Sequence, residues 1–382
     1  MNPGRFPWMI PVLSGLLLAI GLSGIARGDL LIGGPELMPR QASWAAFSLL
    51  AGGLAAVIPY RWFKPWSLGV YLLCLSLLIA VLFFPPRNGA RSWIRLGFAD
   101  FQPSEVMKLA FVLAFSRLMT REAGYRRWTG LIVPFLAAAV PMLLILREPD
   151  LGTSLLFLPM LFAMLFAAGA RQRHLVIVGL MGVVVAPIAW KVMSSEQRSR
   201  ITAVFRQHDG PTKRVGDDEL HLHQSKQMLA LGGVWGSAFL GDAVADPAAY
   251  KLPVARSDFV FCLIGERWGL IGTLTVLGLF SLLIQRGLHA ATSTQDPYAR
   301  LVAVGLSTCL AVQVVINTGM TTGILPITGL PLPLLSYGGS SLLSTAFSLG
   351  LLTNIARSPT RTLEGEPFRF RETQAALTTQ YS

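Results

Sequence analysis

Two oppositely charged side chains stand at the start of an apolar stretch of this 382-residue chain. Glu105 and Lys108 lie three residues apart, so on a helix they share one face and can form an ion pair. A charged group within an apolar span is energetically costly and usually functional. The spacing allows two interpretations: a pair that only fixes packing, or a pair that faces a water-filled cavity and holds an anionic group.

A third charged residue, Asp258, ends a long polar segment and opens another apolar stretch. This position suits an N-terminal helix cap as well as a catalytic carboxylate. Glu266 and Arg267 follow about two helical turns later and require partners in an apolar environment. The residue types therefore mark Asp258 as a candidate for acid–base chemistry without excluding a structural role.

Prolines mark two further segments beside apolar stretches. Residues 147–150, Arg-Glu-Pro-Asp, separate two such stretches and predict a tight external turn into a helix N-terminus, where the carboxylates serve the turn alone or a site beside it. Residues 323–341 contain three prolines and several glycines, which a plain helix does not accommodate. We expect a broken or re-entrant segment lining an external cavity, with a tight hairpin between two spans as the alternative.

The elements that position these residues are predicted to be membrane helices. The chain is 53% hydrophobic and only 14% charged, whereas soluble domains average about 25% charged residues. Long continuous apolar runs predict helices rather than strands, because a bilayer requires internally satisfied backbone. The first run is expected to be a retained span, not a signal peptide. The sequence thus predicts an all-α polytopic membrane protein with ten spans, at residues 8–26, 43–60, 67–84, 104–119, 129–146, 151–169, 174–192, 258–284, 300–322 and 334–356.

Basic residues predict the orientation. With both termini in the cytoplasm, Lys and Arg number 15 in the cytoplasmic parts and six in the short external loops, as the positive-inside rule favours. The net charge of +12 is attributed mainly to this topology and to anionic membrane lipid, not to nucleic acid. We expect a single domain over residues 1–357, a large external loop at 193–257 between the seventh and eighth spans, and a disordered cytoplasmic tail at 358–382.

Within the large loop, residues His223–Leu231 are predicted to form an amphipathic helix, and the polar segment 206–219 is expected to be mobile. The three cysteines, Cys74, Cys262 and Cys309, fall inside predicted spans and imply no disulfide framework. No metal-ligand spacing is present among the histidines and cysteines.

Six segments together resemble the SEDS (shape, elongation, division, sporulation) family, which includes the RodA, FtsW and SpoVE proteins. They occur in the family's order between about residues 89 and 357, and the Asn317–Met320 start of the last one looks more like RodA. The segments are 89–108 (GARSWIRLGFADFQPSEVMK), 148–154 (EPDLGTS), 197–205 (QRSRITAVF), 224–233 (QSKQMLALGG), 258–272 (DFVFCLIGERWGLIG) and 317–341 (NTGMTTGILPITGLPLPLLSYGGSS).

The resemblance implies a peptidoglycan glycosyltransferase of the bacterial cytoplasmic (inner) membrane, serving cell-wall elongation and cell shape. Such proteins polymerise lipid II at the outer membrane face and pair with a class B penicillin-binding protein that crosslinks the product. The family's essential loop aspartate corresponds to Asp258, and its functional Glu and Lys correspond to Glu105 and Lys108.

The chain departs from the family pattern immediately before Asp258. The usual Leu-Pro-Glu-x-His-Thr-Asp has Val254, Arg256 and Ser257 in place of Glu, His and Thr, and the family's Glu-Glu-Leu-Gly is replaced by residues 266–269, Glu-Arg-Trp-Gly. An arginine two residues from Asp258 is expected to favour the ionised carboxylate.

The reaction that the resemblance implies predicts a role for each charged candidate. Asp258 is expected to act as general base on the acceptor hydroxyl in an inverting transfer. Cations are expected to stabilise the departing diphosphate; the candidates are Lys108, Arg91, Lys226 and Arg256. No cofactor is certain, although a divalent cation such as Mg²⁺ would suit the same diphosphate. Further candidates for substrate contact are Trp93, Gln224, Ser225, Ser336, Gly338 and Gly339.

Two other function classes stay open from sequence. A lipid II flippase also needs many spans, broken helices and charges in the membrane, but paired interrupted segments in two halves are not evident. A scaffold that recruits a cell-wall synthase has little use for Glu105, Lys108 and Asp258 in or beside the bilayer.

Overall fold

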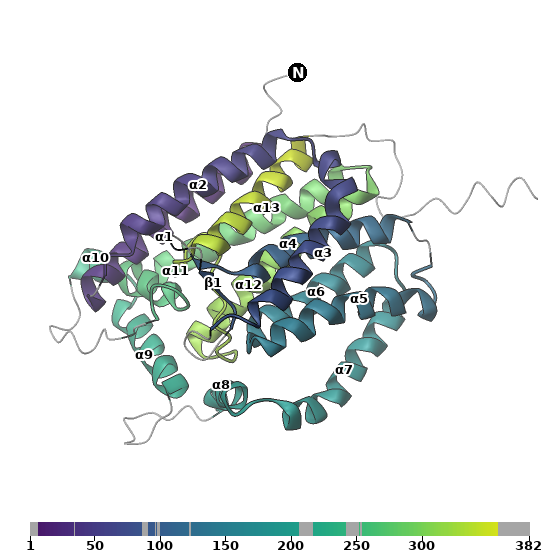
Figure 1. Cartoon of the computed structure of the whole chain (residues 1–382). Helices are drawn as coiled ribbons and strands as arrows, with labels where there is room; N and C mark the ends of the chain where they lie inside the picture. Colours follow the sequence, from purple (N-terminus) through teal and green to yellow (C-terminus); the bar gives the residue numbers. More distant parts are fainter. Residues whose placement is uncertain are drawn as a thin grey trace, which may run out of the picture.

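The computed structural model describes residues 7–33, 35–85, 91–95, 97, 100–121, 124–205, 217–241, 252 and 254–357. The described chain is almost entirely helical, which confirms the predicted all-α class (Figure 1). Its long helices are α1 (Met9–Ile32), α2 (Met38–Val57), α3 (Phe63–Val81), α4 (Pro103–Arg121), α5 (Trp128–Arg147), α6 (Leu151–Ala167), α7 (Gln172–Val192), α11 (Val260–Ser293), α12 (Pro297–Thr322) and α13 (Gly339–Arg357). Shorter elements are the 3₁₀ turn Tyr60–Trp62, α8 (Ser195–Phe205), α9 (Asp217–Gly232), α10 (Ser237–Leu240) and an antiparallel hairpin of β1 (Ile94–Arg95) and β2 (Asp100–Phe101).

Each of the ten predicted apolar stretches coincides with one long helix of the described chain. In that part of the chain, five helical segments are long and apolar enough to cross a membrane: Met9–Ile32, Tyr60–Val81, Trp128–Arg147, Val260–Ser293 and Pro297–Thr322. The count of ten spans and the external position of the large loop therefore stay predictions. The predicted tail, 358–382, lies outside the described residues.

Small residues allow close helix packing between α2 and α13, which lie side by side in Figure 1. A Cβ on Gly52 would lie 2.8 Å from the Ala346 carbonyl oxygen, so only glycine permits this approach. The amide of Asn354 then donates to the carbonyl oxygens of Ala56 and Ile58 at 2.9 and 2.8 Å. Close backbone contact and polar side-chain bonds are the usual way in which membrane helices associate.

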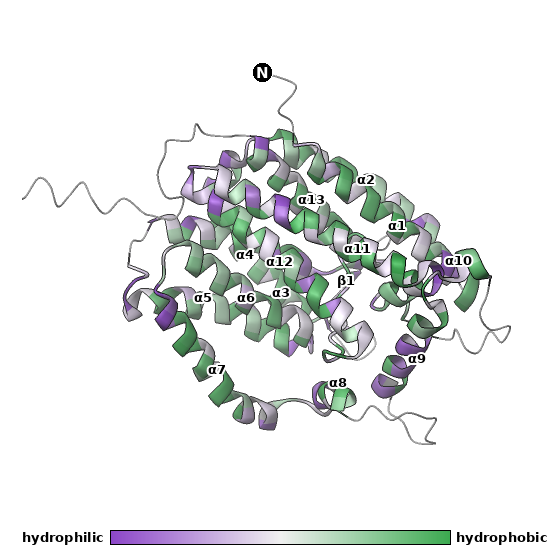
Figure 2. Ribbon diagram, turned by 180° about the vertical axis from the view of Figure 1, so that it is seen from behind, coloured by the Kyte–Doolittle hydropathy of each residue, from purple (hydrophilic) through white to green (hydrophobic). Residues whose placement is uncertain are grey.

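The outer surface of the bundle is apolar, as Figure 2 shows for most of the long helices. Large side chains such as Phe47, Leu72, Leu136 and Val184 are exposed on it. Helix α7 lies apart from the bundle in Figure 1, and nearly all of its described side chains are exposed. Because exposed apolar surface on this scale is unfavourable in water, the arrangement agrees with a bilayer around the helices.

Helix ends differ from the predicted stretches where polar contacts extend or stop a helix. The first stretch was expected to end at residue 26, but α1 continues to Ile32 because Arg27 and Asp29 find ionic partners on other elements. The last helix begins at Gly339 instead of residue 334, because the preceding prolines and Leu334, with φ 66°, hold irregular backbone. The predicted irregular segment is thus confirmed over 323–338.

Helix α11 is broken at Gly269, which the sequence-based prediction of one continuous span missed. Gly269 has φ 64° and ψ −159°, a conformation that glycine tolerates. The break frees backbone N–H groups, and the Leu270 N–H donates to the Gly233 carbonyl oxygen at 2.9 Å. A Cβ on Gly236 would lie 2.4 Å from the Arg267 carbonyl oxygen, so glycines let the 233–236 loop reach the break. The large loop therefore anchors α11 at its break.

The large loop contains three helices in its described part. The helix predicted at 223–231 is confirmed and is longer, because α9 starts at Asp217. Of the polar segment 206–219 that was expected to be mobile, residues 217–219 form the first turn of α9, where the Ser199 hydroxyl donates to Asp218 at 2.8 Å. Residues 206–216 lie outside the described residues.

Candidate active site

Asp258 lies in the turn that leads into α11. Its N–H donates to the Val254 carbonyl oxygen at 3.0 Å, and its own carbonyl oxygen accepts a hydrogen bond from the Asn317 amide at 2.7 Å. The residue that caps α11 is Phe259, and no side chain caps this helix. The helix-cap alternative for Asp258 is therefore wrong, and this half-buried residue keeps its carboxylate free of a capping role.

The irregular 323–338 segment passes directly beside this carboxylate. Asn317, fully buried on α12, also donates to the Leu330 carbonyl oxygen at 2.7 Å and so ties the segment to the Asp258 turn. A Cβ on Gly329 would lie 3.7 Å from Asp258 Oδ2, and Gly329 has φ 71°. The glycine thus suits both the backbone conformation and the space in front of Asp258.

A cation that sequence reasoning did not select also lies here. Arg200 of α8 places its Nη1 4.0 Å from the same point on Gly329. The arginine belongs to the 197–205 segment that resembles the family, yet that segment carries no other chemical signal. Its closeness to Asp258 depends on where the tertiary structure places α8, and therefore only the structure reveals it.

Burial dominates the electrostatics of Asp258 and raises the pKa of its carboxyl to about 6. The Ser257 hydroxyl and the Arg200 guanidinium oppose this shift in pKa, and the nearby Asp150 adds to it. The expectation that Arg256 tunes Asp258 is wrong, because the Arg256 guanidinium contacts Asp29 at 2.7 Å instead. A carboxyl with a pKa of about 6 is well suited to general-base work near neutral pH.

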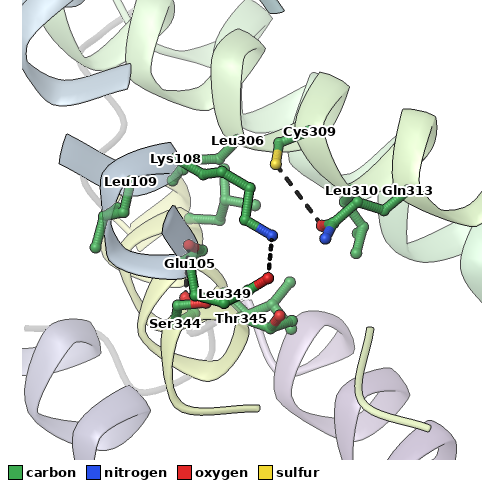
Figure 3. A pocket seen from close by; sticks show the side chains of 12 residues that line it. Glu105, Lys108, Leu109, Leu306, Cys309, Leu310, Gln313, Ser344, Thr345 and Leu349 are labelled. Atoms are coloured by element: carbon green, nitrogen blue, oxygen red, sulfur yellow. Dashed lines mark hydrogen bonds and ion pairs between the residues drawn. The ribbon is translucent and has the colours of Figure 1, made fainter. Parts of the chain in front are cut away.

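Glu105 and Lys108 form the predicted ion pair on α4. Lys108 Nζ lies 2.9 Å from Glu105 Oε1, and the Ser344 hydroxyl of α13 donates to the other carboxylate oxygen at 3.2 Å. Figure 3 shows the pair lining a pocket between α4, α12 and α13. Gln313 lines this pocket, and its buried amide nitrogen has no hydrogen-bond partner among the described residues. The pair thus borders a cavity, as the functional interpretation requires.

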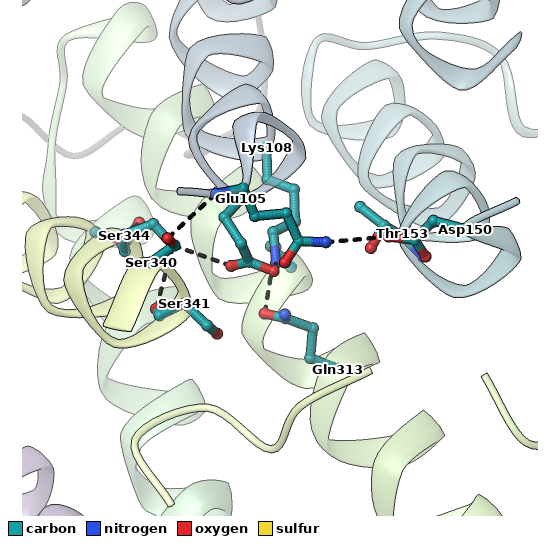
Figure 4. A network of polar contacts seen from close by, with 11 residues as sticks. Glu105, Lys108, Asp150, Thr153, Gln313, Ser340, Ser341 and Ser344 are labelled. Carbon is teal, nitrogen blue, oxygen red and sulfur yellow. Dashed lines mark hydrogen bonds and ion pairs between the residues drawn. The ribbon is translucent and has the colours of Figure 1, made fainter. Parts of the chain in front are cut away.

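A polar network extends from this pair toward the start of α6. Figure 4 places Glu105 and Lys108 between the serines of α13 and Asp150 with Thr153. Asp150 caps α6 by accepting from the Thr153 N–H at 2.9 Å and also accepts from the Gln102 amide at 3.3 Å. The predicted turn into a helix N-terminus is therefore confirmed. Burial raises the pKa of Asp150 as well.

Glu148 lies two residues before Asp150 and is a buried carboxylate beside the network. Its side chain is fully buried, and neither carboxylate oxygen has a hydrogen-bond partner among the described residues. Burial, reinforced by the charge of Asp150, raises the pKa of Glu148 to about 8. Glu148 is therefore mostly protonated at neutral pH.

The glycine-rich end of the irregular segment is held by α2. The Gln41 amide donates to the Ser336 carbonyl oxygen at 3.0 Å and accepts from the Gly338 N–H at 3.2 Å. A Cβ on Gly339 would overlap the ring of Trp44. Ser336 and Gly338 thus hold the segment through their backbone groups, and Gly339 leaves room for the Trp44 ring.

The remaining candidates lie on other parts of the described chain. Arg91 is exposed and donates to the Leu82 carbonyl oxygen at 3.1 Å, while Trp93 is half-buried beside the β hairpin. On α9, Lys226 and Gln224 are half-buried, and the fully buried Ser225 hydroxyl donates to the Thr321 carbonyl oxygen of α12 at 2.8 Å. These positions leave their predicted contacts with substrate as predictions.

Carboxylates do not gather into a metal site in the described part of the chain. No group of three or more His, Cys, Asp or Glu residues there is arranged to hold a metal ion. The three cysteines are free thiols. A divalent cation stays a prediction from the chemistry of diphosphates, and no step below depends on it.

Comparison with known proteins shows close relatives over nearly the whole chain. The FtsW/RodA/SpoVE family profile, described as cell cycle proteins, matches residues 5–361. Stage V sporulation protein E of Bacillus subtilis is 34% identical over 327 residues, covering 83% of this chain and 86% of that protein. The peptidoglycan glycosyltransferase MrdB of Escherichia coli K12 is 34% identical over 354 residues, covering 91% and 92%.

A solved structure also matches this chain. A chain from a structure described as coordinating polymerization and crosslinking in a peptidoglycan synthase complex matches with a TM-score of 0.79 and 30% identity, covering 92% of this chain and 98% of that one. The equal identity to MrdB and to the sporulation protein does not test the RodA-like character predicted from residues 317–320. The profile match and the two relatives nevertheless show that this chain belongs to the FtsW/RodA/SpoVE family of cell cycle proteins.

Proposed function

We propose that this chain is a peptidoglycan glycosyltransferase that polymerises lipid II at the outer face of the bacterial cytoplasmic membrane. The observation that carries the proposal is the state of Asp258. Its carboxylate does not cap a helix, and its pKa lies near 6. The same activity is named for MrdB, which aligns with nine tenths of this chain. The apolar outer surface suits a substrate whose lipid tail stays in the bilayer.

The reaction transfers a sugar from an undecaprenyl diphosphate to an acceptor hydroxyl. The acceptor GlcNAc 4-hydroxyl oxygen attacks the anomeric carbon while the bond from that carbon to the diphosphate oxygen breaks. The bonding electrons leave with the diphosphate, and Asp258 takes the hydroxyl proton and later releases it to water. A single displacement inverts the α-linked donor into a β-linked product, so no covalent enzyme intermediate is needed. General-base assistance of this kind typically contributes about 10²–10⁴-fold.

Fixed cations support departure of the diphosphate. Arg200 joins Lys108 as a candidate because it lies at the Asp258 turn. Arg256 is a weaker candidate than the sequence suggested, since Asp29 neutralises it. The pocket beside Lys108 is lined by polar side chains within the bundle. A charged diphosphate held next to the bilayer requires such polar partners.

Orientation and partner complete the proposal. Both termini lie in the cytoplasm, so that Asp258, the large loop and the β hairpin face outward. The partner is a class B penicillin-binding protein, which crosslinks the new strands during cell-wall elongation. Support comes from the related chain solved within a peptidoglycan synthase complex.

The test is polymerisation of purified lipid II by the wild type and by Asp258→Asn, alone and with a class B penicillin-binding protein, analysed on a gel. We expect polymer from the wild type only, with both proteins equally folded. Equal polymer from both would exclude Asp258 as the base. If the protein moves lipid II across liposome membranes without making polymer, a transporter is favoured. If Asp258→Asn still allows a partner synthase to work at the wild-type level, a scaffold is favoured.

A further inference from the structure

A buried ion pair connects the Asp258 turn to the first helix. Arg256 Nη1 lies 2.7 Å from Asp29 Oδ1, and both side chains are about nine tenths buried. The second carboxylate oxygen of Asp29 accepts from the N–H groups of Leu37 and Met38 at 3.0 and 2.9 Å. Asp29 thus joins the end of α1, the start of α2 and the turn before α11.

Arg256 connects the hairpin formed by α1 and α2 with the rest of the site. Its Nη1 also donates to the Pro35 carbonyl oxygen at 3.2 Å, and its own carbonyl oxygen accepts from the Tyr337 N–H at 2.9 Å. A Cβ on Gly28 would lie 2.6 Å from Arg256 Cγ, so the arginine stem crosses α1 where glycine leaves room. One residue therefore ties the α1–α2 hairpin and the irregular segment to the turn that carries Asp258.

We infer that Asp29 is a positioning residue that fixes the catalytic turn 254–258 through its ion pair with Arg256. The inference rests on the proposed role of Asp258 as general base. Asp258 lies on irregular backbone two residues after Arg256, so a shift of the arginine moves the carboxylate. Displacing a catalytic group by about 1 Å can reduce turnover about 100-fold.

The buried position of Arg256 calls for a counter-ion. An arginine stays charged and, when buried, requires an anionic partner. Asp29 supplies that partner, so the two residues act as one unit in this chain.

The experiment compares Asp29→Asn, Arg256→Gln and the double variant in the full-length protein with lipid II as substrate. Asparagine keeps an oxygen for the Leu37 and Met38 N–H groups but removes the charge that holds Arg256. We expect each single variant to lower kcat about 10- to 100-fold with KM within about twofold. The double variant is expected to lose no more than either single one, because the two residues act together. Arg256→Lys is expected to restore most of kcat.

The matched control is a second buried ion pair of α1, in which Arg27 contacts Glu266 of α11 at 2.8 Å. Arg27→Gln is expected to lower the melting temperature about as much as Asp29→Asn while keeping kcat within about threefold.

Three results would overturn the inference: unchanged kcat in folded Asp29→Asn, an equal loss of kcat in Arg27→Gln, or additive losses in the double variant. A raised KM in Arg256→Gln with normal kinetics in Asp29→Asn would instead show that Arg256 binds substrate directly. An active Asp258→Asn protein would remove the base assignment and with it this inference, whereas failure of the ion-pair variants alone leaves that assignment intact.

Discussion

The side-chain amide of Asn317 donates to the carbonyl oxygen of Asp258 at 2.7 Å, from a fully buried position on α12. The same nitrogen bonds the Leu330 carbonyl oxygen at the same distance. One amide therefore holds the proposed base and the irregular segment in front of it in a fixed arrangement. A general base must keep hydrogen-bond distance to the proton that it removes, so this arrangement has direct consequences for activity.

Replacing Asn317 by leucine is expected to lower the polymerisation rate roughly 10- to 100-fold, because the Asp258 turn loses its support. Two buried carbonyl oxygens lose a donor, which costs about 1–3 kcal/mol of stability. The measurement is polymerisation of lipid II per folded molecule, together with the melting temperature. Asn354→Leu is the matched control, since Asn354 bonds carbonyl oxygens of α2 and its following turn, away from Asp258. Equal activity losses in both variants would contradict a specific role for Asn317.

The raised pKa of Asp258 predicts the pH dependence of the reaction. A general base works only when deprotonated, so kcat/KM should fall about tenfold per pH unit below a midpoint near pH 6. Arg200→Gln removes a positive charge that lowers the pKa of Asp258, and the midpoint should therefore move to higher pH. Initial polymerisation rates between pH 4.5 and about 8 measure both effects.

Arg198→Gln is the control for this shift. Arg198 lies on the same helix, but its guanidinium donates to the carbonyl oxygens of Met193 and Lys191 at 3.0 Å each. Its removal should leave the midpoint unchanged. The electrostatic role of Arg200 would be refuted by an unshifted midpoint in Arg200→Gln or by equal shifts in both variants.

Local features of the fold and the site could be predicted from sequence. The apolar runs gave the positions of the long helices, since bilayer-spanning segments are set by length and hydropathy. The Glu105–Lys108 pair followed from a spacing of three on one helix. The irregular backbone at 323–338 followed from its prolines. In each case neighbouring residues in the chain determine the structure.

Contacts between distant segments could not be predicted. Arg256 and Asp29 are 227 positions apart, and no local pattern connects them. The break at Gly269 depends on carbonyl groups of the 233–234 loop, so the helix sequence alone reads as continuous. Arg200 approaches Asp258 and Gly329 only through the place that the tertiary structure gives to α8. The charged partners at the site are therefore a product of tertiary structure.

Glu148 predicts how stability depends on pH. Its native pKa of about 8 exceeds the ordinary value of 4.5, so between these values the native state holds a proton that the unfolded state lacks. The free energy of unfolding should then fall as pH rises through this range, by up to about 1.4 kcal/mol per pH unit. Glu148→Gln removes the ionisation and should match the wild type at pH 4.5 but exceed its melting temperature at about pH 8. Exposed Glu36→Gln is the control. Parallel melting curves for Glu148→Gln and wild type would contradict the burial argument.

The Glu105–Lys108 pair tests whether the pocket serves catalysis or only packing. Removing one partner leaves a buried charge without its counter-ion, so Glu105→Gln or Lys108→Met alone should cost roughly 3–5 kcal/mol of stability. The double variant contains no uncompensated charge and should regain most of the lost melting temperature. We expect it to remain inactive, because it lacks the cation proposed to support the diphosphate.

The matched double variant is Arg27→Met with Glu266→Gln, which removes an ion pair of comparable burial away from the pocket. It should be folded and should polymerise lipid II within about threefold of the wild-type rate. If the double variant at 105 and 108 also polymerises at that rate, the pair has only a packing role. If it folds without activity while the control remains active, the pocket belongs to the catalytic site, because both variants lose a buried pair and only one loses the cation beside the substrate.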